Sequence, residues 1–301
     1  MVAQSLLVAP NDSEAFQRSF AWRLRWWIVG LPAGVGFASL RACLKLWLGF
    51  SPEKAGVYSA GNGPAMRSAL LGVYFADAPD LRHRYVRASA RLTHHDPRAA
   101  IAAAAVAETA AHLVHGCDGS PALFTALEEL STDSEWRSLA ARLRGAFANG
   151  EPVDQFAHSV GATHGVSGYA YQTAPVAIYA ALVHRDDFDA ALGAAIACGG
   201  DTDTVSSIVG ALVGARVGAS SIPKTWKTDL ADWPRSIHLL EKIGVRLRSQ
   251  QSVSCGHGPV RYFWPAIPLR NLFFLGIVLV HGFRRLFPPY GGEGEKELWK
   301  S

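Results

Sequence analysis

Cysteine is scarce in this chain of 301 residues, and its few copies lie far apart. Cys43, Cys117, Cys198 and Cys255 form no Cys-x-x-Cys pair and belong to no His/Cys cluster with the spacing of a zinc site. A disulfide framework needs denser cysteines and a structural zinc site needs closely spaced ligands, so the sequence disfavours both. We therefore expect a reducing, cytoplasmic compartment.

Charged residues are also sparse, at 18% of the chain. Lysine and arginine number 29 against 25 acidic residues, which leaves a formal net charge of +4. That excess is too small to favour a nucleic-acid surface, but it is compatible with a small anionic ligand. Hydrophobic residues make up 49% of the chain, which excludes disordered and fibrous classes. The short apolar stretch at 2–8 has no basic residue before it and does not resemble a signal peptide.

Alternating apolar and polar residues, the pattern of a half-buried strand, are nearly absent. Helical signals replace them. The clearest is the alanine-rich segment 98–115, which follows Asp96 as an N-cap and Pro97 at the first helical position. Periodicity and capping residues predict further helices at 16–28, 33–50, 120–129, 134–148, 152–158, 173–183, 187–197 and 204–217. We expect an all-α fold with one compact multi-helix domain over residues 1–248.

The remaining segment, 249–301, differs in character from the helical domain. We expect a polar linker, an apolar helix, and a glycine-rich, charged end that frays. The apolar block at 272–280 is shorter than the roughly 20 residues that cross a bilayer. Two interpretations stay open: a helix docked on the domain, which the shortness favours, or an interfacial helix in peripheral membrane contact through 272–287.

The most distinctive polar segment is a glycine pair, Gly199 and Gly200, followed by Asp201, Asp203 and Thr204. Residues i and i+2 do not share a helix face, so the two carboxylates converge only if the chain turns, as the glycines allow. Two carboxylates and a hydroxyl suit a hard cation such as Mg²⁺ or Mn²⁺. A plain N-cap explains the same residues and needs only one of the side chains, so composition alone favours capping.

A second polar segment lies in the glycine- and proline-rich stretch 51–64, which we expect to be a loop. It contains Ser59, Gly61, Asn62 and Gly63 and precedes a predicted helix. Glycines that flank a polar residue let backbone N–H groups approach an anion such as a phosphate. Gly-Asn-Gly is equally typical of an ordinary tight turn, which turn chemistry alone favours.

Two further polar loops precede predicted helices. His94 and His95 stand before Asp96, and Tyr169 lies just before the helix predicted at 173–183. The simpler interpretations are a capping loop with exposed imidazoles and a half-buried tyrosine. The alternative places one histidine ring against a ligand.

Together and in this order, the four segments resemble the ADP-ribosylglycohydrolase family over about residues 1–248. The most specific element is Gly200 to Thr204, followed by Gly210 and Gly214 on the next helix. The family includes hydrolases that remove ADP-ribose from arginine and serine. Because four segments match, the resemblance outweighs the simpler interpretation of each one.

The resemblance implies an all-α bundle with a pair of Mg²⁺ or Mn²⁺ ions at the base of a cleft. It implies metal-dependent hydrolysis of the glycosidic bond between ADP-ribose and an acceptor, with ADP-ribose or an ADP-ribosylated protein as partner. We expect a monomer and no nucleic acid. Asp201 and Asp203 would be catalytic and would bind metal together with Thr204. The substrate-binding residues would be Ser59, Gly61, Asn62 and Gly63 at the diphosphate, Met66 near the ribose, His94 at the adenosine end, and Tyr169.

The sequence departs from the family at its first metal-binding element, a Thr-Asp-Asp that this chain does not contain. Either that element lies upstream of Met1, or the chain is a non-catalytic ADP-ribose-binding homologue that has lost half of the metal site. Three oxygen ligands leave a metal pair short of protein donors, so these residues alone predict weak or absent turnover. Ala60 replaces an aromatic residue of some members, which leaves the acceptor undefined.

Overall fold

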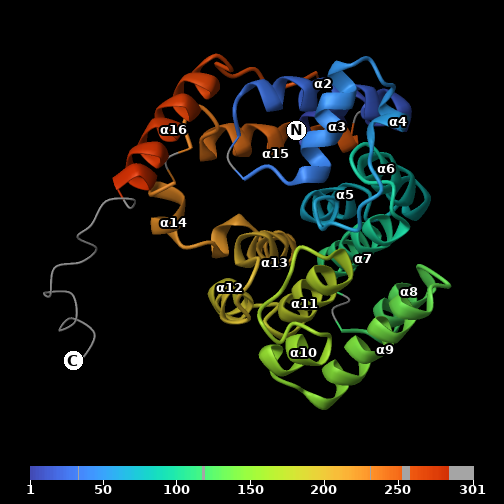
Figure 1. The fold of residues 1–301 in the computed structure, drawn as a ribbon. Coiled ribbons are helices and arrows are strands. Elements are labelled where there is room, and N and C mark those ends of the chain that lie inside the picture. The colour runs from blue at the N-terminus through green and yellow to red at the C-terminus, as the bar shows by residue number, and fades with distance from the viewer. Residues whose placement is uncertain (33, 117–118, 231, 253–257, 285–301) are drawn as a thin grey trace, which may run out of the picture.

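The computed structural model describes residues 1–32, 34–116, 119–230, 232–252 and 258–284. Within these ranges the chain forms sixteen α-helices and two short 3-10 helices, and its only β-type pairings are isolated bridges (Figure 1). The all-α prediction is therefore confirmed. The polar linker predicted from 249 is wrong for residues 249–252, which continue the helix Ile237–Ser252. The rest of that linker, at 253–257, and the predicted frayed end lie outside the described residues.

The helices form two groups that meet at α7 (Figure 1). The first group is α1 (Val2–Val8), α2 (Ser13–Val29), α3 (Phe37–Trp47), α4 (Pro52–Ala55), α5 (Ala69–Tyr74), α6 (Pro79–Arg91), α15 (Ile237–Ser252) and α16 (Ala266–Arg284). The second is α7 (Pro97–Val114), α8 (Pro121–Glu129), α9 (Ser134–Asn149), α10 (Val153–Ser159), α11 (Ala170–Val183), α12 (Phe188–Ala197), α13 (Thr202–Val217) and α14 (Lys224–Thr228). The 3-10 helices span Ala65–Arg67 and Ala219–Ser221.

Helix α7 begins and packs as its sequence predicts. The Asp96 side chain accepts a hydrogen bond from the Arg98 N–H at 3.0 Å, and Pro97 occupies the first turn. Alanines on opposite sides of α7 enter the two hydrophobic cores, for example Ala102 in one and Ala103 in the other. Small side chains on every face let helices approach from both groups, which makes α7 the central element.

Helix α3 differs from the buried helix predicted at 33–50. It is shorter, and it buries Ala42, Cys43 and Leu46 while Phe37 is 85% exposed. The helix therefore lies at the edge of the fold and packs through one stripe. Apolar composition predicted burial because it does not distinguish a one-sided contact from a surrounded helix.

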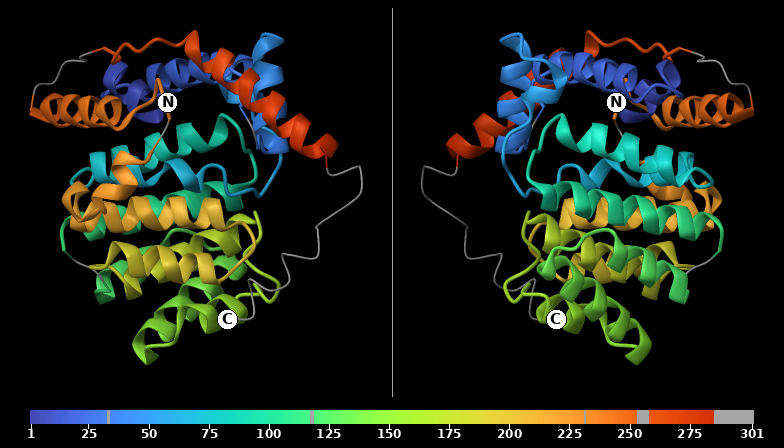
Figure 2. Two further views of the ribbon diagram at one scale, coloured as in Figure 1. Left: turned by 90° about the vertical axis from the view of Figure 1, so that its left-hand side faces the viewer. Right: turned by 90° about the vertical axis from the view of Figure 1, so that its right-hand side faces the viewer.

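Helix α16 is longer and more exposed than the sequence predicts. It has 19 residues and, by length and composition, could cross a membrane. Only Ala266 and Ile267 are buried, while Phe273 and Val280 are each 69% exposed. The docked arrangement favoured from the sequence therefore holds only for the first turns of α16, and residues 272–284 are exposed. Figure 2 shows α16 passing over the N-terminal helices and extending beyond them.

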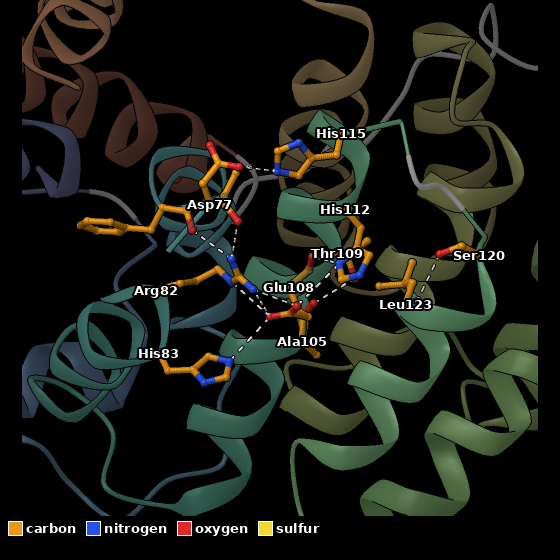
Figure 3. Close-up of polar contacts among 12 residues, drawn as sticks. Asp77, Arg82, His83, Ala105, Glu108, Thr109, His112, His115, Ser120 and Leu123 are labelled. Carbon is orange, nitrogen blue, oxygen red and sulfur yellow. Dashed lines mark hydrogen bonds and ion pairs between the residues drawn. The ribbon is translucent and has the colours of Figure 1, made fainter. Parts of the chain in front are cut away.

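A buried ion pair joins α6 to α7 (Figure 3). Arg82 donates two hydrogen bonds to Glu108 through Nη2, at 2.8 and 2.9 Å, and a third through Nε at 3.0 Å. The Arg82 Nη1 donates to the carbonyls of Phe75 and Ala76, each at 2.9 Å. Both side chains are less than one-tenth exposed, so they depend on each other for solvation.

Candidate functional site

The four polar segments singled out from the sequence are joined directly by backbone hydrogen bonds. These bonds are Val57 N to Thr93 O (3.1 Å), His95 N to Val57 O (2.8 Å), Asn62 N to Gly168 O (3.0 Å), Ala170 N to Ala60 O (2.8 Å), Val166 N to Gly199 O (3.0 Å) and Asp201 N to Val166 O (2.7 Å). The loops that precede α7, α11 and α13 therefore form one assembly with the 57–63 loop. Segments more than 100 residues apart in the chain lie side by side here.

The glycine pair before α13 makes the turn that the sequence predicts. Gly199 and Gly200 have φ values of +70° and +78°, in the left-handed region that glycine adopts at little cost. A Cβ atom at Gly200 would lie 2.2 Å from the Val166 carbonyl oxygen. Glycine is thus required both by the backbone conformation and by the close approach of the neighbouring loop.

Asn62 connects the glycine-rich loop to the acidic turn. Its Nδ2 donates a hydrogen bond of 2.7 Å to Asp201 Oδ2 and another of 3.1 Å to Thr173 Oγ1. Thr173 in turn donates to the Ser167 carbonyl at 2.8 Å. This chain of bonds fixes one oxygen of the Asp201 carboxylate relative to two other loops.

Asp201 occupies the N-cap position of α13, as the plain capping interpretation predicts, but its side chain forms no capping hydrogen bond of standard geometry. Its short hydrogen bond is the one from Asn62, so the carboxylate does more than cap the helix. Burial raises the pKa of the Asp201 carboxyl, but hydrogen bonds from Asn62 and Thr204 lower it by more. The pKa of Asp201 therefore lies below its ordinary value. Asp201 is accordingly a carboxylate at neutral pH, held as an acceptor within the site.

Asp203 and Thr204 complete the predicted oxygen set. Asp203 is exposed, whereas Thr204 is 8% exposed. Their oxygens, with those of Asp201, have the chemistry that one hard divalent cation prefers. Three side chains do not make a cage for two cations, and the described ranges contain no cluster of three His, Cys, Asp or Glu that could hold a metal. The described residues therefore do not fit a pair of metal ions.

His94 is buried against the glycine-rich loop, so the exposed imidazole expected of a simple capping loop is wrong for this residue. Arg67 donates to Thr93 Oγ1 at 2.7 Å, and Thr93 Oγ1 lies 2.8 Å from His94 Nδ1. When the Thr93 hydroxyl donates to Nδ1, the ring proton lies on Nε2. Nε2 would be 3.0 Å from a Cβ at Gly61, which places this donor beside the 61–63 backbone.

The environment of His94 makes a prediction about stability at low pH. Burial, followed by the charge of Arg67, lowers the pKa of His94 from 6.5 to about 4. As pH falls from 6.5 through 4, the unfolded chain binds a proton that the folded chain refuses. His94 should therefore remove at most about 3 kcal/mol of stability over this window. Urea unfolding between pH 4 and pH 7.5 measures this change.

The His94→Gln variant should show a flatter loss of stability over that pH range than the wild type. The matched control is His164→Gln, because His164 is exposed. If the free energy of unfolding falls equally steeply toward low pH in His94→Gln and in the wild type, His94 is not the cause of the acid destabilisation.

The other predicted substrate residues lie around this assembly in different environments. Ser59, Gly61, Asn62 and Gly63 are half-buried along the loop, whereas Met66 is 46% exposed on the following 3-10 helix. Tyr169 is half-buried, and its hydroxyl donates to Glu135 at 2.8 Å. The structure thus brings all these positions to one region, while their roles toward a substrate stay predictions.

The sequence alone does not reveal the role of Thr173 or the contacts through which Arg67, a structural residue, supports Thr93. Thr173 is predicted only as the start of a helix, yet it accepts a hydrogen bond from Asn62, 111 residues away. Nothing local distinguishes it from a helix-start threonine. Arg67 also donates to the Ser89 and Gly63 carbonyls, so it ties the 57–63 loop to helix α6.

The fold and the site define an all-α protein whose helix-start loops converge on one polar region. The family model for ADP-ribosylglycohydrolase matches residues 1–253, and the chain belongs to this family. Its fold agrees, since a solved "ADP-ribosylglycohydrolase-related protein complex" superposes with a TM-score of 0.57 and 28% identity, covering 84% of this chain and 78% of that chain.

Two relatives show how far the similarity extends. An uncharacterized protein of Archaeoglobus fulgidus is 32% identical over 230 residues, which cover 76% of this chain and 72% of that protein. Human ADP-ribosylhydrolase ARH3 is 28% identical over 210 residues, which cover 59% of this chain. The match spans 56% of the human protein, a little over half of its length.

Proposed function

We propose that this chain is an ADP-ribosyl hydrolase that cleaves the glycosidic bond between ADP-ribose and an acceptor with the help of Mg²⁺ or Mn²⁺. The observation that carries the proposal is the 2.7 Å hydrogen bond from Asn62 to Asp201. It links the loop suited to a diphosphate with the acidic turn suited to the ribose end. Family membership and the similarity to ARH3 proteins support the same assignment.

The proposed roles follow from the chemistry of each group. Backbone N–H groups of loop 59–63 and the His94 Nε2–H would bind the diphosphate, remote from the reacting carbon, and this binding energy positions the substrate. Breaking the glycosidic bond builds positive charge on the ribose, which the carboxylates of Asp201 and Asp203 would stabilise. A divalent cation held by Asp201, Asp203 and Thr204 would act as a Lewis acid toward the substrate oxygens.

The second candidate is a homologue that binds ADP-ribose without cleaving it. The small donor set favours this alternative, since Asp201, Asp203 and Thr204 are only three oxygen donors and the described residues contain no cluster of three or more His, Cys, Asp or Glu that could hold a metal. The two candidates share the ligand and differ only in turnover. A cytoplasmic location and a monomeric state stay part of the proposal.

Release of ADP-ribose from ADP-ribosylated serine and arginine peptides tests the proposal. We expect slow release with Mg²⁺ or Mn²⁺ that stops when a chelator removes the cation and resumes when the cation is restored. Calorimetric titration with ADP-ribose is run in parallel. Tight binding without release from either peptide would identify the non-catalytic candidate, and neither binding nor release would overturn both.

A further inference from the structure

Helix α16 exposes apolar side chains in every direction around its axis. Leu272, Phe273, Phe274 and Leu275 are consecutive, so at 100° per residue they point to different sides, and each is at least 44% exposed. A helix that packs against a protein uses one apolar stripe and turns a polar face to water. An apolar surface that continues around the whole helix is instead removed from water on all sides when the helix lies in hydrocarbon.

A cluster of four tryptophans lies at the beginning of α16. The Trp26 ring centroid is 5.7 Å from that of Trp22, 5.9 Å from Trp47 and 5.8 Å from Trp264, which stands two residues before the helix. Trp22 and Trp47 are 57% and 49% exposed. Exposed tryptophans with a polar N–H and an apolar ring are the residues that concentrate at the level of lipid headgroups. We call this set the tryptophan cluster.

Charge and length along α16 fit the same environment. The helix contains no acidic residue, and its basic residues are Arg270, His281 and Arg284. The segment 271–283 between the two arginines, with no Asp, Glu, Lys or Arg, is about 20 Å long at about 1.5 Å per residue. That length passes the midpoint of a hydrocarbon core of about 30 Å. Arg270, at the root of the helix, would lie at the near polar boundary, where anionic headgroups attract a cation, whereas Arg284 would reach the far boundary only by extending its side chain.

The first turns of α16 are fixed to the folded domain. Asn271 Nδ2 donates to the Gly30 carbonyl at 2.6 Å. Arg270 pairs with Asp232 and donates to the Trp233 carbonyl at 3.1 Å. Residues from 272 onward leave the domain, so the helix has a rigid root beside the tryptophan cluster and a projecting apolar part (Figure 2).

We propose that α16 inserts into a phospholipid bilayer that carries anionic headgroups, with the tryptophan cluster at the interface and the helical domain held at the membrane surface. The inference does not depend on the reaction assigned to the site. It gives the exposed apolar helix a single partner, the lipid phase.

Flotation of the full chain with vesicles of phosphatidylcholine containing phosphatidylglycerol tests this proposal. We expect at least about tenfold more protein in the floated fraction than without vesicles, with less on phosphatidylcholine alone. The double variant Leu275→Asp, Leu279→Asp should lose flotation, because it places two charges on the projecting part. The matched control is Leu240→Asp, Val245→Asp on α15, where both side chains are more than half exposed.

Circular dichroism and sedimentation velocity without lipid accompany the flotation. All four substituted positions are exposed, so the helical content of both double variants should equal that of the wild type. Flotation that persists in the α16 variant, or is lost equally in the α15 variant, would overturn the proposal. The proposal would also be overturned if the wild type does not float and instead forms a dimer that dissociates in the α16 variant.

Discussion

The Asp201→Asn variant should release ADP-ribose at least about 100-fold more slowly than the wild type, which reduces turnover to background. Asparagine has the same shape, and its carbonyl oxygen can still accept the hydrogen bond from Asn62, so the loop assembly should persist. What disappears is the negative charge that the proposed function places beside the ribose and the cation. Initial rates at saturating Mn²⁺ measure the effect, and thermal unfolding checks that the fold is retained.

The matched control is Asp154→Asn, which removes an exposed carboxylate from the first turn of another helix, α10. This variant should turn over like the wild type. Equal rates in Asp201→Asn and Asp154→Asn would show that the acidic turn has no part in the reaction. A large fall in the melting temperature of Asp201→Asn would instead assign Asp201 a structural role.

The Glu108→Ala variant should lower the free energy of unfolding by about 3–5 kcal/mol. Arg82 would then be a buried cation without its carboxylate, held only by the carbonyls of Phe75 and Ala76. The desolvation of an unpaired guanidinium is the source of this cost, since the pair itself contributes little net stability. Urea unfolding at pH 7 measures it.

Two controls distinguish the cost of leaving a buried charge unpaired from the cost of losing an ion pair in general. Glu14→Ala breaks the exposed pair with Arg18, whose side chains are 82% and 59% exposed, and should cost less than about 1 kcal/mol. The double variant Arg82→Met, Glu108→Leu removes both charges and should recover most of the stability lost in Glu108→Ala. A double variant as unstable as the single one would show that the loss comes from packing.

The helices that could be predicted from sequence are those with local signals. Asp96 and Pro97 determine where α7 begins, because they cap it and occupy its first turn. Gly199 and Gly200 determine the turn before α13, because few other residues adopt its positive φ values. Each signal needs only neighbours in sequence. The fold class and the existence of the polar loops were therefore accessible before the structure.

The links between the loops could not be predicted in the same way. Asn62 and Asp201 are 139 residues apart, and no local pattern states that one holds the other. The same applies to Arg82 and Glu108, which look like surface helix residues in sequence yet are buried together. The sequence also leaves α16 open between a docked and an interfacial helix, because apolar composition predicts burial without specifying whether protein or lipid provides it.

The crystal structure of the chain with bound ADP-ribose would test the proposed site most directly. The account predicts diphosphate oxygens within about 3 Å of the backbone N–H groups at 59–63 and a ribose beside Asp201. A ligand confined to the groove of about 730 Å³ between α6, α7 and α8, whose lining includes His94, with no contact to the 59–63 backbone or to Asp201, would contradict it.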